Sequence, residues 1–368
     1  MGTDNMDEGR KSKGEEKVKF AVVGCGHIGK RHIEMIQRNP EAELVAICDI
    51  LPLEFLSLNS SLLTLNSSLL TLNSSLPYFS NLESLLSSGI SFDVLNICVP
   101  NGFHAAMAIR GMETGHNVVI EKPMALSAEE AGKILYTADK HNKKVFCVMQ
   151  NRYSPPSVWI KEMVESERLG KLYLVQINCF WNRDARYYLY NSWHGDKALD
   201  GGTLFTQFSH FIDLMYWLFG DIQNIDAHFM DFNHQSLTDF EDSGIVTFEF
   251  MNGGSGVLNY STSIYDTNFE SSVTIIAENG TIKIGGQYMN EVSYCHVKDY
   301  VMPVLPPTNP GNDYGSYKGS AQNHHLVIEN VVNVLRNKEI EITTNADEGY
   351  KVVDIIERIY KLKSKNQL

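Results

Sequence analysis

The chain has 368 residues, of which 43 % are hydrophobic and 20 % charged, and its formal net charge is −13. This length allows two domains with a sizeable core, and the composition is that of an ordinary globular protein. The acidic balance argues against a nucleic-acid partner, and no apolar run reaches the ~18 residues of a membrane span. Six scattered cysteines without a CxxC pair predict buried, reduced thiols in a cytoplasmic protein without a metal site.

Residues 1–16 are rich in charged side chains and contain no apolar stretch that would suit a secretory signal. We expect them to form a disordered tail.

Residues 17–149 alternate between apolar runs of strand length and segments of helical periodicity. Strands are predicted at 20–23, 43–49, 92–100, 117–123 and 144–150. Helices are predicted after residue 28 and at 105–114 and 127–140. Buried strands that alternate with helices indicate a doubly wound parallel sheet, so this segment is predicted to be a Rossmann domain.

Residues 150–368 have longer strands in which apolar and polar residues alternate, at 171–181, 244–263 and 270–286. Asn-Gly-Gly at 252–254 and Glu-Asn-Gly at 278–280 are hairpin signals. Amphipathic helices are predicted at 325–335 and 347–361. The whole chain is therefore predicted to be α/β, with a C-terminal α+β domain whose large, mainly antiparallel sheet leaves one face open. Because an uncovered face needs burial, we expect a homo-oligomer, a dimer or a tetramer.

Three nearly identical heptads fill residues 57–77, with leucines spaced alternately by four and three residues. The pattern predicts a lengthened second helix over 53–76, about 36 Å long at 1.5 Å per residue. A looped-out insertion and a coiled coil with a partner are the alternatives. The repeat has no ionisable side chain, so we expect no catalytic role for it.

Gly24, Gly26 and Gly29 form a GxGxxG turn between the first strand and the first helix. Asp49 ends the second strand, 20 residues after the last glycine. This spacing is typical of a dinucleotide site, in which the helix N-terminus with His27 and Ile28 holds the pyrophosphate and the acid binds the adenine ribose. An acid there favours NAD over NADP. A plain tight turn is the alternative.

In such a sheet the cofactor crosses the carboxyl ends of the strands. Polar residues there are therefore candidate cofactor contacts. They are Pro100, Asn101, His104, Glu121 and Lys122, to which we add Trp193 as a stacking partner. A lysine at a buried strand end is costly unless it is paired or used.

In the segment Asp200–Asp213, two glycines follow Asp200 and open a stretch of helical periodicity. Its polar residues follow each other at intervals that place them on one stripe, which we expect to line a cavity: Thr203, Thr206, Gln207, His210 and Asp213. A histidine on an apolar helix is more often a core residue, but four polar neighbours favour a site.

Together, the GxGxxG turn, Glu-Lys-Pro at 121–123 and the Gly-Gly…His…Asp helix resemble the Gfo/Idh/MocA family of NAD(P)-dependent oxidoreductases. The resemblance covers nearly the whole chain from Lys17. It implies that Lys122 and His210 flank the carbon that gives up hydride. His210 would be the general base and Lys122 would stabilise the developing charge, although the resemblance leaves open which of them is the base.

Within that family, residues 181–202 and 319–332 look like the WlbA/WbpB-type dehydrogenases, which oxidise C3 of UDP-N-acetyl-glucosaminuronic acid (UDP-GlcNAcA) for surface polysaccharides such as lipopolysaccharide O-antigen. Inositol- and glucose-type members often have Asp where this chain has Thr206. The expected substrate contacts are Asn151, Arg152, Arg183, Tyr187, Thr206 and Gln207, besides the catalytic pair. Arg186 could also meet an anion, and Trp181 and Tyr188 could stack on a ring. A dehydrogenase of a free sugar or inositol, and a regulator without turnover, are the alternatives.

Overall fold

The computed structural model describes residues 16–53, 76–189, 193–315, 317–336 and 339–363. The predicted tail over 1–16 lies outside these residues except for its last position. The predicted long helix over 53–76 lies outside them except at its two ends.

In the described residues, six parallel strands form the first sheet, in the order β3-β2-β1-β4-β5-β6. The strands are β1 (Val18–Val23), β2 (Ala42–Cys48), β3 (Tyr78–Phe79), β4 (Val94–Ile97), β5 (Asn117–Ile120) and β6 (Val145–Cys147). The helices are α1 (His27–Arg38), α3 (Leu82–Leu86), α4 (His104–Glu113) and α5 (Ala128–His141). The Rossmann prediction is confirmed. It missed β3 and α3, because a strand of two residues and a helix of five are too short to show a hydrophobic periodicity.

The second sheet has seven strands within the described residues, in the order β13-β12-β11-β7-β10-β9-β8. Its neighbours are antiparallel except β7 and β10, which run parallel. The strands are β7 (Leu172–Phe180), β8 (Ile222–Met230), β9 (Ser243–Phe250), β10 (Ser255–Ser261), β11 (Glu270–Ala277), β12 (Gly280–Gly285) and β13 (Glu291–Val297). The predicted α+β domain is confirmed, with β8 and β13 added.

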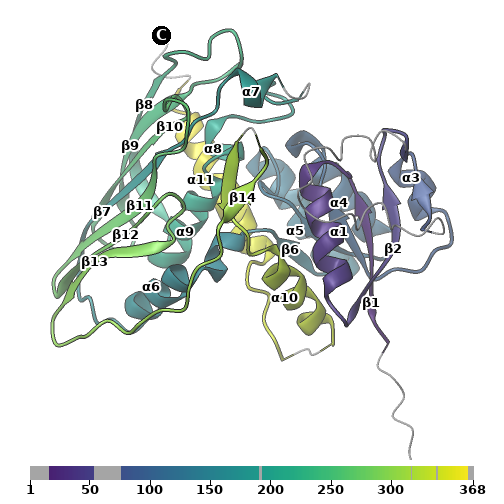
Figure 1. The fold of residues 1–368 in the computed structure, drawn as a ribbon, viewed down its shortest axis with the longest axis horizontal. Helices are drawn as coiled ribbons and strands as arrows, with labels where there is room; N and C mark the ends of the chain where they lie inside the picture. Colours follow the sequence, from purple (N-terminus) through teal and green to yellow (C-terminus); the bar gives the residue numbers. More distant parts are fainter. Residues whose placement is uncertain (1–15, 54–75, 190–192, 316, 337–338, 364–368) are drawn as a thin grey trace, which may run out of the picture.

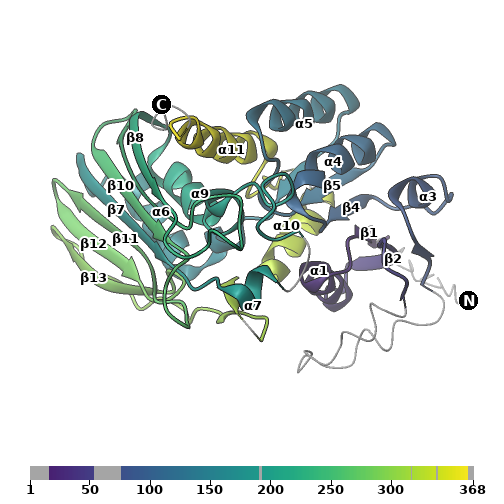
Figure 2. The ribbon, with the colours of Figure 1, turned by 90° about the horizontal axis from the view of Figure 1, so that it is seen from above.

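Helices cover one face of this second sheet, between it and the Rossmann domain, and leave the other face bare (Figures 1 and 2). They are α6 (Pro155–Glu165), α8 (Thr203–Thr206), α9 (Ser209–Phe219) and α11 (Ala346–Tyr360), while α7 (Ala185–Tyr188) lies near a rim. The alternating burial along β9 matches a sheet with one covered face.

The chain returns to the first sheet near its end. A short ribbon of β14 (Gly311–Asp313) and β15 (Lys318–Ala321) precedes α10 (His324–Arg336). Val327 and Val331 of α10 share a core with Phe20 and Ile33 of the Rossmann domain. The two segments therefore pack against each other, and the domain boundary at residues 149/150 stays a prediction. None of the described helices is long and apolar enough to cross a membrane.

Candidate active site

The glycine turn has a geometry that side chains would disrupt. Gly24 has φ +85°, and a Cβ there would lie 2.3 Å from the carbonyl oxygen of Cys98. A Cβ on Gly29 would lie 1.8 Å from the carbonyl oxygen of Gly24. By contrast, Gly26 is exposed and a Cβ there would meet no atom within 4 Å, so the N-terminus of α1 faces open space. The turn thus has the room at a helix N-terminus that a dinucleotide pyrophosphate needs.

Asp49 directly follows β2 and lies beside this turn. Its Oδ2 accepts a hydrogen bond of 2.6 Å from the backbone N–H of Cys25, and its Oδ1 accepts one of 2.8 Å from Leu51. These bonds fix the carboxylate next to the turn, where a ribose contact is expected. His27 and Ile28, the first residues of α1, are half-buried.

The carboxyl ends of β4 and β5 meet α8 of the second domain. Asn101 Nδ2 donates to Thr206 Oγ1 at 2.7 Å and to the carbonyl oxygen of Asp200 at 2.8 Å. Lys122 Nζ donates to the carbonyl oxygen of Thr206 at 2.5 Å, and Thr206 Oγ1 donates to the Asp200 carboxylate. The predicted residues of both domains are therefore brought together at one place, next to half-buried Pro100.

Burial perturbs the charges at this junction. It raises the pKa of the Asp200 carboxyl to about 6, although hydrogen bonds from Thr206 and Gly195 oppose the shift. It also lowers the pKa of Lys122, against the opposing charge of Glu121. A buried lysine with a lowered pKa beside a buried carboxyl with a raised pKa is typical of sites that move protons.

His210 lies near the start of α9 and is 2 % exposed. Its Nδ1 is buried and has no hydrogen-bond partner among the described residues. Burial, together with the charge of Lys122, lowers the pKa of His210 well below its usual range. The imidazole is therefore neutral at physiological pH, which is the state that a proton acceptor needs.

The prediction of one helix with one polar stripe is wrong in part. The segment forms two helices, because the N–H groups of Gln207 and Phe208 both donate to the carbonyl oxygen of Thr203 and end α8 there. Thr203 Oγ1 donates to the carbonyl oxygen of Glu241, away from His210. Thr206 and Gln207 stay with the junction described above.

Arg152 is paired with carboxylates inside the fold. Its guanidinium binds Asp213 with two hydrogen bonds of 2.8 and 2.6 Å, and Glu348 with one of 2.8 Å. The side chains of Arg152 and Asp213 are both fully buried. Because Asp213 and Glu348 already balance its charge inside the fold, Arg152 is not available as a counter-charge for an anionic substrate, and we do not propose it as a substrate contact. Asn151 is also buried, and its Oδ1 accepts a hydrogen bond from Ser320.

Arg183 differs because it is equally buried yet has no carboxylate partner among the described residues. Its Nε donates to Gln207 Oε1 at 2.7 Å, and other donors reach carbonyl or amide oxygens. Three rings surround the guanidinium at 4.8–5.2 Å from their centroids, namely Trp181, Tyr187 and Tyr317. A buried cation without an anion is costly, so this arrangement suits an anionic ligand.

The other residues predicted for the site are divided between the surroundings of the rings beside Arg183 and places elsewhere in the fold. Trp193 contacts His194, which stacks on Tyr187 with ring centroids 4.1 Å apart. His104 is fully buried, with its ring nitrogens near the carbonyl oxygens of Pro123 and Val99, so it packs between strand ends. Arg186 is exposed and pairs with Asp184 and Asp266, and Tyr188 packs on Tyr187 and His234.

Sequence reasoning missed three residues of this region. Asp200 could have been found from the sequence, because an acidic residue before two glycines indicates a turn that its side chain can hold. Tyr317 and His194 have no periodic signal, since they lie in irregular segments that reach the site only in the folded chain.

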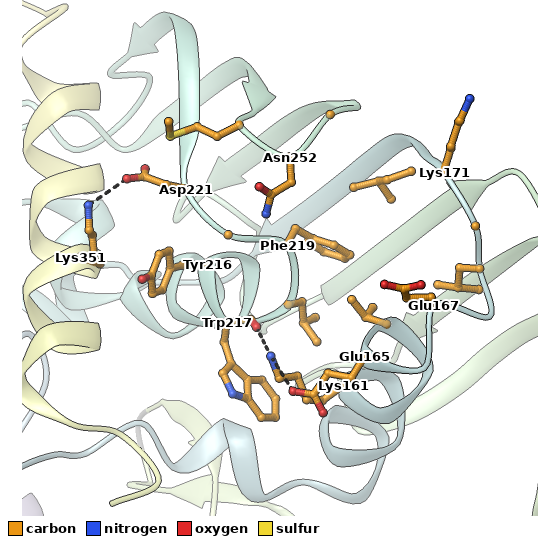
Figure 3. Close-up of a pocket in the computed structure, with 18 of the residues that line it drawn as sticks. Lys161, Glu165, Glu167, Lys171, Tyr216, Trp217, Phe219, Asp221, Asn252 and Lys351 are labelled. Atoms are coloured by element: carbon orange, nitrogen blue, oxygen red, sulfur yellow. Dashed lines mark hydrogen bonds and ion pairs between the residues drawn. The ribbon is translucent and has the colours of Figure 1, made fainter.

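One hollow in the described part of the chain lies elsewhere (Figure 3). Its volume is about 880 Å³, and α6, the end of α9 and α11 line it. The cations of Lys351 and Lys161 are paired there with Asp221 and Glu165 (Figure 3). Neither Lys122 nor His210 lines this hollow, so we do not consider it the catalytic site.

Comparisons with known proteins agree with this geometry. Residues 18–149 match the oxidoreductase family with an NAD-binding Rossmann fold, and residues 158–283 match the GFO/IDH/MocA C-terminal domain. The WlbA dehydrogenase from Bordetella pertussis, solved with NADH and UDP-GlcNAcA, is 30 % identical with a TM-score of 0.80, over 96 % of this chain and 98 % of that one.

The chain belongs to the Gfo/Idh/MocA family of oxidoreductases. The WlbA dehydrogenase from Chromobacterium violaceum, also solved with NADH and UDP-GlcNAcA, is 28 % identical with a TM-score of 0.80, over 95 % of this chain and 94 % of that one. D-glucoside 3-dehydrogenase from Escherichia coli is 23 % identical over 94 % of this chain and 95 % of its own length.

This Gfo/Idh/MocA protein is thus an NAD-dependent oxidoreductase. The glycine turn, its open space and the adjacent Asp49 fit that cofactor.

Proposed function

We propose that this enzyme oxidises the C3 hydroxyl of UDP-GlcNAcA to the 3-keto sugar, in the synthesis of nucleotide sugars for surface polysaccharide. The observation that carries the proposal is the buried Arg183 without a carboxylate partner among the described residues. An anionic substrate would supply its missing counter-charge. The similarity to two WlbA dehydrogenases solved with UDP-GlcNAcA supports the same substrate.

In this proposal NAD, held by the glycine turn and Asp49, would supply the hydride acceptor, while His210 and Lys122 act on the hydroxyl group of the sugar. His210, neutral because it is buried, takes the proton of the sugar hydroxyl. Lys122 donates a hydrogen bond to the same oxygen and stabilises the charge that develops there. The bond from Lys122 to the carbonyl oxygen of Thr206, the last residue of α8, ties the ammonium to the segment that leads into α9 and His210.

The remaining predicted contacts stay proposals for the same complex. Gly24, Gly26, Gly29 and Asp49 bind the pyrophosphate and the ribose. Gln207 and Tyr187, joined by a hydrogen bond of 2.8 Å, orient Arg183 toward the sugar nucleotide.

A dehydrogenase of a free sugar is the second candidate, favoured by the similarity to D-glucoside 3-dehydrogenase. The rate of NADH formation with different sugars distinguishes the two candidate functions. NADH formation with UDP-GlcNAcA is expected to exceed that with UDP-GlcNAc, glucose or inositol by at least tenfold in kcat/KM, about 1.4 kcal/mol of discrimination. Preference for a neutral free sugar would contradict the proposal, and no turnover of any sugar would favour a non-catalytic regulator.

We also propose that the open face of the second sheet forms a homo-oligomer. Leu174 and Ile276 are cross-strand partners there, and both are 40 % exposed. Ile245 and Tyr294 add exposed apolar surface on the same face of the sheet. Light scattering on the purified protein tests this proposal, and a monomer at micromolar concentration would contradict it.

A further inference from the structure

The ribbon of β14 and β15 lies between the second sheet and α1 (Figure 1). Its two strands are antiparallel, with Asp313 opposite Lys318, and the backbone N–H of Tyr314 donates to the carbonyl oxygen of Tyr317 at 3.1 Å. The two tyrosines therefore lie at the same end of the ribbon, where their rings stack with centroids 4.9 Å apart. The proton and hydride steps proposed above use neither ring.

Tyr317 packs against the arginine that we assign to the anionic substrate. Its ring centroid lies 5.2 Å from Arg183 Cζ and 4.9 Å from the ring centroid of Tyr187. Arg183 Nη2 also donates to the carbonyl oxygen of Lys318, on β15, at 3.0 Å. Because a guanidinium is attracted to an aromatic face and to a carbonyl oxygen, the ribbon and Arg183 hold each other in place.

Tyr314 packs against the cofactor turn in the other domain. Its ring meets the imidazole of His27 edge to face, with centroids 5.6 Å apart and planes at 74°. His27 is the first residue of α1, whose N-terminus faces the open space beside Gly26. A pyrophosphate bound at this helix N-terminus would adjoin that imidazole. One end of the ribbon thus contacts both the cofactor turn and, through Tyr317, the proposed anion site.

Charges of both domains act on the Tyr314 hydroxyl. Burial raises its pKa, with Tyr317 and Glu121 reinforcing the rise, whereas Arg31 and Arg183 oppose it. Arg31 belongs to α1 and Glu121 follows β5 in the Rossmann domain, while Arg183 belongs to the second domain. The phenol therefore lies where the electrostatic fields of the two sites overlap.

We propose that Tyr314 is a positioning residue shared by the two binding sites, which through Tyr317 fixes the cofactor turn relative to Arg183. The first ligand to bind then holds the ribbon in place, and the second ligand binds to a site that is already formed. Each ligand strengthens the binding of the other by the same factor, because such coupling is reciprocal. The inference rests on the proposed anion site at Arg183 and adds no chemical step to the reaction.

The main test uses NADH with UDP-GlcNAcA, a pair that cannot react because the cofactor is already reduced and the sugar is not yet oxidised. Calorimetry gives the Kd of UDP-GlcNAcA without and with NADH, and the ratio of these two values is the coupling factor. We expect a coupling factor of about tenfold or more in the wild type, and of less than about threefold in Tyr314→Ala. Tyr314→Phe, which keeps the ring, should retain the wild-type factor.

A control variant and two contrary results make this test decisive. Tyr136→Ala removes an exposed tyrosine ring on α5 and should leave the coupling factor unchanged. A wild-type factor close to one would overturn the inference. A factor that Tyr314→Ala leaves unchanged would overturn it as well, since the coupling would then come from direct contact between the two ligands.

A second measurement uses the cofactor alone and so separates failure of this inference from failure of the proposed function. Arg183 lies outside the cofactor turn, and the ribbon connects the two. We expect Arg183→Met to raise the Kd of NADH about threefold or more in the wild-type background, and to have no effect in Tyr314→Ala. An unchanged Kd in Arg183→Met, or an equal effect in both backgrounds, would overturn the inference even in an enzyme that oxidises UDP-GlcNAcA.

Discussion

The two buried arginines of the second domain should respond oppositely to the same substitution. Arg152→Met removes one partner of a fully buried pair and leaves Asp213 without its two hydrogen bonds. Breaking such a pair costs about 3–5 kcal/mol of unfolding free energy, because the remaining charge stays buried. Loss of the ion pair with Glu348 adds little to this cost, because the Glu348 side chain is 23 % exposed and water can replace Arg152 there. Urea unfolding followed by circular dichroism should therefore show a clearly lower midpoint for Arg152→Met.

Arg183→Met removes a buried cation that has no carboxylate partner among the described residues, so its loss relieves a desolvation cost and offsets the hydrogen bonds given up. We expect an unfolding midpoint close to that of the wild type. Binding should suffer instead, since a charged hydrogen bond contributes about 1.5–3 kcal/mol, or roughly ten- to a hundredfold in KM for UDP-GlcNAcA. UDP-GlcNAc, which lacks the carboxylate, serves as the control for that group. The reasoning is refuted if Arg152→Met raises KM at unchanged stability while Arg183→Met leaves KM unchanged.

Three further predictions concern the junction and the cofactor turn. His210→Asn and Lys122→Met should each lower turnover by about 10²–10⁴-fold with the cofactor still bound, and near-normal rates in both would contradict their roles. Gly24→Ala should weaken NAD binding at least tenfold by calorimetry, because its Cβ would lie 2.3 Å from a carbonyl oxygen; unchanged affinity would refute the turn geometry. Asp200 has its pKa raised from 3.8 to about 6, so the folded state holds its proton more tightly than the unfolded state. The wild type should therefore lose about 2 kcal/mol relative to Asp200→Asn as the pH rises from 4 through 6 to 7, and parallel stability curves would contradict the shift.

Much of the fold could be predicted because its signals are local. Most strands of the Rossmann domain are short, largely buried apolar runs, as at Val94–Ile97, and the helices between them are amphipathic. The hairpins of the second sheet were marked by their glycines at 252–254 and 278–280. β8 and β13 escaped prediction because exposed polar residues interrupt their apolar pattern.

The site could be predicted less well, because its geometry depends on long-range partners. The spacing of Thr203 and Asp213 suggested one stripe with His210, but spacing cannot show that Glu241 and Arg152 engage them. In the same way, sequence alone cannot distinguish the ion-paired Arg152 from Arg183. Tyr314 lies in an irregular segment, and its contact with His27 joins the second domain to the cofactor turn.

The central claim is that the enzyme takes a hydride from C3 of an anionic nucleotide sugar. The most direct test uses UDP-GlcNAcA that carries deuterium only at C3 and locates the label after one turnover. We predict that the deuterium is transferred to C4 of the nicotinamide and that the product is the 3-keto sugar. Deuterium that stays at C3 of an oxidised product would contradict the account.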